Sequence, residues 1–224
     1  MELMHDYGVA AVARARSMPR RDGSRVVRRI ADIVGATVLL VLCAPVLVLA
    51  ALAIWIESGR PVLFGHTRLG LGGKPFRCWK LRTMVVDAEA RLERDPWLKK
   101  LYIQNGYKLP ADIDPRITRV GRWLRRTYLD ELPQLFNVLG GSMSLVGPRP
   151  IVRGELAWYG DAADELLSEK PGIFGAWTSR GSNRPHYPER ARVELEYVRN
   201  RSLLGDVRIL ARSIPVVLRG QGAE

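Results

Sequence analysis

Residues Ile33 to Ile56 read IVGATVLLVLCAPVLVLAALAIWI, a run of 24 residues that carries no charge. As one α-helix this run would be about 36 Å long, which exceeds the hydrocarbon core of a bilayer at about 30 Å. The run therefore predicts a membrane-associated helix near the start of an otherwise polar chain. Its length alone fits an ordinary spanning helix and a re-entrant helix equally well.

Two features of the run and its flanks favour the re-entrant form. Pro45 lies near the middle, where it removes a backbone donor and clashes with the preceding turn, so the helix is expected to break there. Residues 1–32 carry seven Arg and four acids, and residues 57–84 carry six Lys or Arg and one acid. Positive flanks favour the cytoplasmic side. A hairpin within one leaflet keeps both basic flanks on the cytoplasmic side, whereas a spanning helix places one of them on the opposite side. The sequence favours the hairpin but does not decide between the two.

The rest of the chain is expected to form a mostly helical α/β domain. Residues 1–24 are expected to form a basic arm, residues 25–58 a membrane helix broken at Pro45, and residues 59–224 a soluble-type domain. Two short strands are expected around a glycine-rich turn, and helices elsewhere. The strands are expected at 62–64 and 76–79, and the helices at 85–101, 122–139 (in two pieces), 151–169 and 189–219. The last helix is amphipathic, which fits an anionic membrane surface or packing on the protein's own core.

Composition excludes several kinds of protein. The chain has 224 residues, a net charge of +12 and two cysteines, too few for a disulfide framework or a cysteine-rich zinc site. Residues 1–84 hold +8 of the charge, and the remaining 140 residues, with 22 basic and 18 acidic groups, hold only +4. The excess is therefore a charge that flanks the membrane helix. A nucleic-acid binder is disfavoured, because the sequence shows no nucleic-acid-binding motif.

The densest polar cluster, TRVGRWLRRTYLDELPQ, spans residues 118–134. Asp130 and Glu131 lie near the start of a helix, and Thr127 with Asp130 resembles a capping box, so a plain helix-stabilising role competes with a chemical one. Four arginines crowd just upstream: Arg119, Arg122, Arg125 and Arg126. Guanidinium groups bind phosphate in a fork, while carboxylates hold Mg²⁺ or attack phosphorus directly. The cluster therefore favours a phosphorylated substrate.

At this point the motifs resemble a known family, the bacterial sugar transferases, also called small monotopic phosphoglycosyl transferases. The resemblance covers nearly everything after residue 25. It rests on RRIAD (28–32), the proline within the apolar run, RLGLGGKPFRCWKLRTM (68–84), DPRITRVGRWLRRTYLDELPQLFNVLGGSMSLVGPRP (114–150), PGIFGAW (171–177) and LEYVRNRSLLGDVRIL (195–210). The block at 114–150 is long and specific, whereas a lone Asp-Glu pair would mean nothing.

The resemblance implies an activity and its substrates. Such enzymes move a sugar 1-phosphate from a UDP-sugar to undecaprenyl phosphate, a polyprenyl phosphate, at the cytoplasmic face of the bacterial membrane, and they release UMP. This role implies membrane lipids as partners and Mg²⁺ or Mn²⁺ as cofactor, excludes nucleic acid, and leaves a homodimer open. The step would begin exopolysaccharide, capsule, O-antigen or glycoconjugate assembly.

The resemblance also implies roles for particular residues. Asp130 would be the nucleophile that forms a covalent phosphosugar intermediate, and Glu131 would help it to hold the metal. The implied substrate-binding residues are Arg68, Lys80, Arg82, Arg125, Pro148, Arg149 and Pro150, and Pro45 is the implied break in the membrane helix.

Several positions depart from the family pattern. The usual Ser-Pro break is Ala44-Pro45, and the usual PGITGWAQVNGR is PGIFGAWTSRGS, which leaves the identity of the sugar open. Glu194 stands where the family usually has Asp. An inactive membrane-bound scaffold for polysaccharide assembly stays as an alternative, although both acids of the Asp-Glu pair are present.

Overall fold

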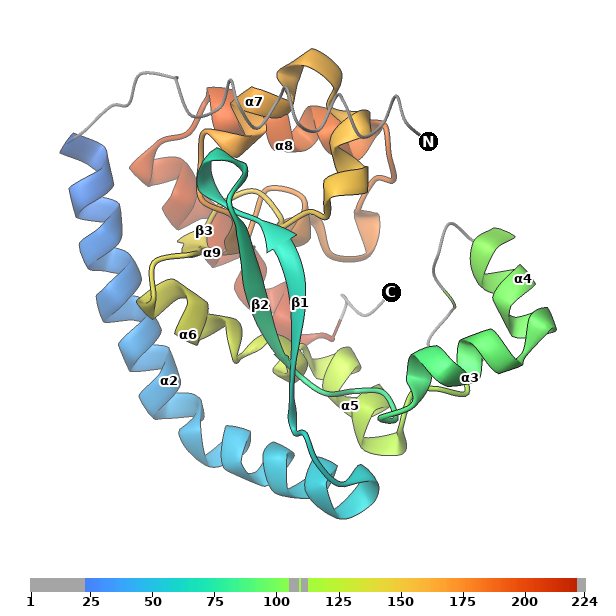
Figure 1. Cartoon of the computed structure of the whole chain (residues 1–224). Coiled ribbons are helices and arrows are strands. Elements are labelled where there is room, and N and C mark those ends of the chain that lie inside the picture. The colour runs from blue at the N-terminus through green and yellow to red at the C-terminus, as the bar shows by residue number, and fades with distance from the viewer. Residues whose placement is uncertain (1–22, 105–108, 110–112, 221–224) are drawn as a thin grey trace.

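The computed structural model describes residues 23–104, 109 and 113–220 (Figure 1). The expected basic arm, residues 1–24, lies almost entirely outside these residues. Helices dominate the described part, and the strands form two small two-stranded sheets. The expected mostly helical α/β class is therefore confirmed.

The first helix, α2, runs from Gly23 to Ser58 with Pro45 inside it. A helix broken at Pro45 was expected at 25–58. The helix is present, but the expected break is wrong, because the helix continues through Pro45. Figure 1 shows that its first and second halves run in different directions. Pro45 accounts for the bend, because its ring clashes with the preceding turn and it lacks an N–H.

Helix α2 leaves most of its apolar surface bare. Its 35 residues from Ser24 to Ser58 are long and apolar enough to cross a membrane, and only 11% of its most apolar 18-residue window is buried. Val41, Leu42 and Ile56 are each more than two-thirds exposed. Exposed apolar surface of this extent is uncommon on soluble monomers and marks a surface that contacts lipid or protein.

Both halves of α2 are nevertheless tied to the rest of the chain. In the first half, the Arg29 guanidinium donates to the carbonyls of Val138 and Leu139 at 2.6 and 2.7 Å. In the second half, the carboxylate of Glu57 accepts from the backbone N–H groups of Arg119 and Val120 at 2.8 and 3.0 Å. The helix is therefore fixed to the elements that carry the polar cluster.

A β-hairpin follows α2. Strand β1 (Leu63–Leu69) pairs antiparallel with β2 (Pro75–Leu81). The turn between them is the short 3₁₀ segment η1 (Leu71–Gly73), in which Gly72 and Gly73 have φ of 65° and 70°. Only glycine adopts such angles readily, so the glycine-rich turn is confirmed with the two strands that it was expected to join.

The polar cluster folds as a helix, a tight turn and a second helix, as its sequence predicted. The elements between the hairpin and the second sheet are α3 (Ala88–Arg94), α4 (Pro96–Gln104), α5 (Arg119–Thr127), η2 (Leu129–Glu131) and α6 (Gln134–Leu139). Asn137 of α6 accepts from the N–H of Trp79 at 2.9 Å and donates to the carbonyl of Arg77 at 2.7 Å. This buried amide fixes α6 along the edge of strand β2.

The C-terminal half surrounds a short parallel sheet. Strand β3 (Ser144–Val146) pairs with β4 (Gly172–Phe174). The remaining elements are η3 (Arg153–Trp158), η4 (Gly160–Ala162), α7 (Ala163–Leu167), η5 (Thr178–Asn183), α8 (Glu189–Arg199) and α9 (Leu203–Leu218). A continuous helix over 151–169 was wrong, because this stretch forms two 3₁₀ segments and one short α-helix. Gly160, with φ of 49°, interrupts it.

Candidate active site

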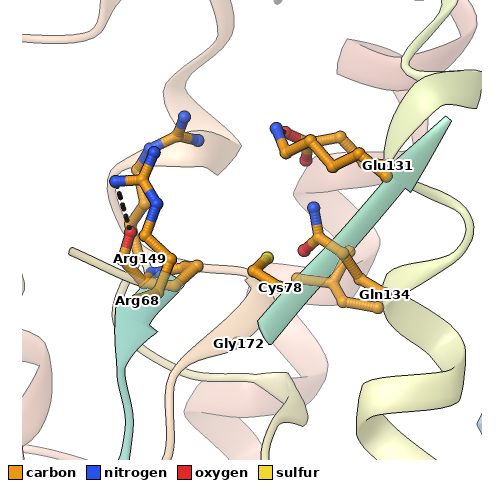
Figure 2. A pocket seen from close by; sticks show the side chains of 9 residues that line it. Arg68, Cys78, Glu131, Gln134, Arg149 and Gly172 are labelled. Carbon is orange, nitrogen blue, oxygen red and sulfur yellow. Dashed lines mark hydrogen bonds and ion pairs between the residues drawn. The ribbon is translucent and has the colours of Figure 1, made fainter. Parts of the chain in front are cut away.

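An open pocket of about 300 Å³, part of it open to solvent, lies between the hairpin, α6 and the second sheet. Its lining residues are Arg68, Cys78, Lys80, Glu131, Gln134, Arg149, Pro150, Gly172 and Ile173. Figure 2 shows Arg68 and Arg149 on one side, Glu131 and Gln134 on the other, and Cys78 between them. Basic groups therefore face a carboxylate across the pocket.

A strained turn places the carboxylate pair at the pocket. Tyr128 ends α5 with φ of 59° and ψ of 9°, a left-handed conformation that costs a non-glycine residue about 1 kcal/mol or more. The reversal lets η2 begin at once and sets Asp130 and Glu131 beside strand β2. The expected capping box is wrong, because the Thr127 hydroxyl donates to the carbonyls of Trp123 and Leu124 in the helix before it.

Glu131 is held by an ion pair. Lys80 Nζ lies 2.6 Å from Glu131 Oε1, and both side chains are mostly buried. Burial works to raise the pKa of Glu131, but the charges of Lys80, Arg149 and Arg184 and the hydrogen bond from Lys80 outweigh it and lower the pKa to about 2. Glu131 is thus ionised at any ordinary pH.

The pKa of Asp130 is shifted in the opposite direction. Only 8% of the residue is exposed, and its pKa is raised to about 6, first by burial and then by the neighbouring charge of Glu131, against the charges of Lys80 and Arg125. A raised pKa beside a lowered one marks two carboxylates with different roles. Asp130 is not among the residues that line the pocket, although its chain neighbour Glu131 is.

Arg125 lies behind this pair on α5. Its Nε donates to the hydroxyl of Thr83 at 2.9 Å, and its charge acts on the carboxylate of Asp130. Gly121 lets α5 come this close to the segment after β2, because a Cβ there would lie 2.0 Å from the carbonyl oxygen of Thr83.

The opposite wall is the Pro-Arg-Pro segment. The carbonyl of Pro148 accepts from the N–H of Gly172 at 2.8 Å, and a Cβ on Gly172 would lie 2.0 Å from the backbone nitrogen of Gly147. Beyond this close approach, the N–H of Arg149 donates to the carboxylate of Glu194 at 3.4 Å. The Arg149 backbone is thereby fixed, while its guanidinium is presented to the pocket (Figure 2).

Arg68 completes this wall from strand β1. Its guanidinium lies 3.4 Å from the carbonyl of Pro150 and 3.4 Å from the carboxylate of Glu155. Because the ion pair with Glu155 is long, Glu155 neutralises the charge of Arg68 only in part, and the remaining positive charge acts on the pocket.

The structure therefore brings together most of the site residues expected from the sequence. Arg68, Lys80, Glu131, Arg149 and Pro150 line one pocket, with three residues directly behind or beside it: Arg125, Asp130 and Pro148. Arg82 is not brought to the pocket: it is buried, and its Nη2 donates to the carbonyls of Ser58 and Gly59 at 2.8 Å each. There it satisfies carbonyls at the end of α2.

Cys78, Gln134, Gly172 and Ile173 line the pocket but were not singled out from the sequence as site residues. Cys78 lies two residues before Lys80 on the same strand, so the alternation of side chains along β2 was the signal that could have found it. Gln134 follows the Asp-Glu pair closely in the sequence, and Gly172 and Ile173 belong to the PGIFGAW motif.

The carboxylate pair fits a magnesium ion only in part. Within residues 23–104 and 113–220 no group of three or more His, Cys, Asp or Glu side chains gathers as a metal site. Mg²⁺ in phosphoryl-transfer sites is commonly held by one or two carboxylates, with water and substrate phosphates completing the shell. Asp130 and Glu131 can supply such a pair of oxygen ligands, provided that the substrate supplies others.

The fold and the pocket define a class of protein: a domain that carries, within its described residues, one long apolar helix and a pocket in which arginines face an acidic residue. The chain belongs to the bacterial sugar transferase family, whose model matches residues 23–220. The resemblance stated from the motifs is thereby confirmed.

Individual relatives agree with this membership. The chain is 42% identical over 212 residues to the undecaprenyl-phosphate galactose phosphotransferase of Salmonella typhimurium, covering 89% of the chain and 42% of that protein. It is 39% identical over 195 residues to the UDP-glucose:undecaprenyl-phosphate glucose-1-phosphate transferase of Escherichia coli, covering 84% of the chain and 39% of that protein. The chain therefore spans less than half the length of these two relatives. It is also 37% identical over 205 residues to the exopolysaccharide production protein ExoY of Rhizobium meliloti, covering 88% of the chain and 87% of that protein.

Proposed function

We propose that this protein transfers a sugar 1-phosphate from a UDP-sugar to undecaprenyl phosphate and releases UMP. One observation carries the proposal: Glu131, ion-paired with Lys80 and next to Asp130 in the chain, faces Arg68 and Arg149 across a single pocket. A diphosphate needs positive groups along its length, and transfer of one phosphate needs a nucleophile at one end. The names of the relatives, which include a galactose phosphotransferase and a glucose-1-phosphate transferase, support the same reaction.

The reaction proceeds in two displacements on phosphorus. A carboxylate oxygen of Asp130 attacks the sugar-linked phosphorus, the bond from that phosphorus to the bridging oxygen breaks, and UMP leaves with the electron pair. An oxygen of the lipid phosphate then attacks the same phosphorus, and the acyl-phosphate bond to Asp130 breaks. The products are the lipid diphosphate sugar and the regenerated carboxylate.

The pocket's charges support these steps. Asp130, with its pKa raised to about 6, is mostly ionised at pH 7 and yet less well solvated than a surface carboxylate, which favours attack. Arg68 and Arg149 are positioned to hold phosphate oxygens while charge moves to the leaving group. When Mg²⁺ is bound by Asp130 and Glu131 with the substrate diphosphate, it neutralises phosphate charge.

The bent apolar helix supports a location at the cytoplasmic face of the membrane. Pro45 lies inside α2, and basic residues flank both ends of the apolar run, so a re-entrant arrangement leaves both ends on the same side. The bare apolar face of α2 then contacts membrane lipid, which brings the pocket to a lipid-borne acceptor.

Single-cysteine labelling tests this arrangement. Ser24→Cys and Arg60→Cys, each made in a background that carries Cys43→Ser and Cys78→Ser, are exposed to a membrane-impermeant maleimide in spheroplasts and in inverted vesicles. We expect both positions to react in inverted vesicles only. Reaction of one position from each side would show a spanning helix and contradict the re-entrant proposal.

A UMP-release assay tests the activity. The protein in membranes or nanodiscs is supplied with undecaprenyl phosphate and, in turn, UDP-glucose, UDP-galactose and UDP-GlcNAc. We expect UMP release with at least one donor, loss of release in Asp130→Asn, and normal release in the matched control Asp161→Asn, which changes an exposed acid. Unchanged release in Asp130→Asn would overturn the nucleophile assignment, and no release with any donor would favour an inactive scaffold.

A further inference from the structure

Three arginines converge on one tryptophan beside the pocket. The guanidinium carbons of Arg149, Arg184 and Arg190 lie 5.2, 4.9 and 4.5 Å from the ring centroid of Trp177. Guanidinium groups stack on indole faces because the ring's negative face attracts a cation that is weakly hydrated. Trp177 therefore holds together groups that would otherwise repel one another.

The indole itself is fixed. Its Nε1–H donates to the carbonyl of Pro185 at 2.7 Å, which sets the ring's tilt within its own loop. Arg184 is also fixed near its stem, because its Nε donates to the carbonyl of Gly181 at 2.7 Å. Gly181 has φ of 58° and ψ of −129°, a conformation open to glycine almost alone, so the loop's path depends on that residue.

The three arginines are not equivalent. Arg190 is buried, forms an ion pair with Glu155 at 3.2 Å and also stacks on Tyr187 at 4.6 Å, so its charge is matched within the protein. Arg149 lines the pocket, and within the described residues no carboxylate forms an ion pair with its guanidinium. Arg184 does not line the pocket, but its charge helps to lower the pKa of Glu131, which does. Arg149 is therefore presented to the pocket, and Arg184 adds positive charge next to it on the same ring.

We propose that Trp177 is a positioning residue that fixes Arg149 and Arg184 as a paired guanidinium site for the phosphate group of the leaving nucleotide. This inference rests on the proposed function, because it assigns the part of the pocket that holds UMP. Two planar guanidinium groups on one ring match a phosphate that offers several oxygens. Their mutual repulsion is offset when a dianionic phosphate binds between them.

The test is direct binding of UMP by isothermal titration calorimetry, in an Asp130→Asn background in which no chemistry occurs. Trp177→Leu keeps apolar bulk but removes the ring face, and Trp177→Phe keeps a face. We expect Trp177→Leu to weaken UMP binding about tenfold, as the loss of two partly buried cation–π contacts implies, and Trp177→Phe to remain within about threefold of the parent. Binding of uridine, which lacks the phosphate, should be unchanged in both.

Trp158→Leu is the matched control. Trp158 stacks on Tyr187 at 5.3 Å, and among the described residues no arginine stacks on its ring, so UMP binding should stay at the parent value. If Trp177→Leu fails to fold, as judged by thermal unfolding, Arg184→Gln supplies the test, with a loss of several-fold for UMP and none for uridine.

The outcomes separate this inference from the proposed function. If the parent binds UMP but Trp177→Leu binds it equally well, or loses uridine to the same extent, the positioning role is refuted and the proposed function stands. If the parent binds no UMP, the proposed leaving group is wrong and this inference falls with it.

Discussion

Replacing Asp130 by Asn should abolish transfer and at the same time make the protein more stable. The carboxylate is 8% exposed, and the fold raises its pKa from 3.8 to about 6. A carboxyl group whose pKa is raised on folding holds its proton more tightly in the native state. Its ionisation therefore destabilises the fold as the pH rises above about 4, and the full effect is present above pH 6.

The size of the effect follows from that shift. A pKa difference of about two units corresponds to about 3 kcal/mol of unfolding free energy at pH 7.5. At pH 4.5 most of the native carboxyl is protonated, and the difference falls to about 1 kcal/mol. For a chain of this length, 3 kcal/mol corresponds to a rise in Tm of about 6–12 °C.

Thermal unfolding of Asp130→Asn and the parent, in one detergent at pH 4.5 and 7.5, measures this difference. Glu131→Gln is the matched control, for which the expected change in unfolding free energy has the opposite sign. Because the fold lowers the pKa of Glu131 to about 2, its ionised form stabilises the native state, and the amide should lose about 3 kcal/mol at pH 7.5. A Tm for Asp130→Asn that is equal to or below that of the parent at pH 7.5 would refute the reasoning about the buried charge.

Three further predictions concern activity and stability. The kcat/KM for the donor should fall about tenfold per pH unit below about pH 6, because the nucleophile Asp130 is protonated there. Lys80→Met should move this fall to higher pH, because the charge of Lys80 lowers the pKa of Asp130. A pH–rate profile measures both effects. Arg149→Ala should lower kcat/KM by about 10- to 100-fold, with partial recovery in Arg149→Lys, in steady-state UMP release. Asp32→Ala should lower the unfolding free energy by about 2–4 kcal/mol, because its carboxylate accepts from the Ser144 hydroxyl and the N–H of Leu145 at 2.9 and 2.8 Å; denaturant titration checks this.

Local patterns predicted much of the fold and site. The uncharged run predicted a long apolar helix, which α2 is, but its proline bends the helix and does not break it as expected. The glycines between two apolar stretches predicted the hairpin that carries Arg68 and Lys80. The Asp-Glu pair was expected near the start of a helix, and it lies just before α6, in the turn that follows α5. These features depend on residues close together in the sequence, which is why they could be anticipated.

What the sequence did not predict depends on contacts between distant segments. Lys80 and Arg82 are two residues apart and would share a face of a strand, but β2 ends at Leu81, so Arg82 turns to the end of α2 instead. The cluster of arginines on Trp177 joins residues 149, 177, 184 and 190, and no local spacing indicates it. The left-handed backbone conformation of Tyr128 could not be predicted either, because a tyrosine at this position does not by itself favour such a turn.

The most direct test of the account is to incubate the protein with a donor UDP-sugar in the absence of undecaprenyl phosphate and to map the protein by mass spectrometry. The account predicts stoichiometric UMP release and a phosphosugar adduct on the peptide that contains Asp130, absent in Asp130→Asn and discharged when undecaprenyl phosphate is added. An adduct on another residue, or UMP release that requires the acceptor from the start, would contradict it.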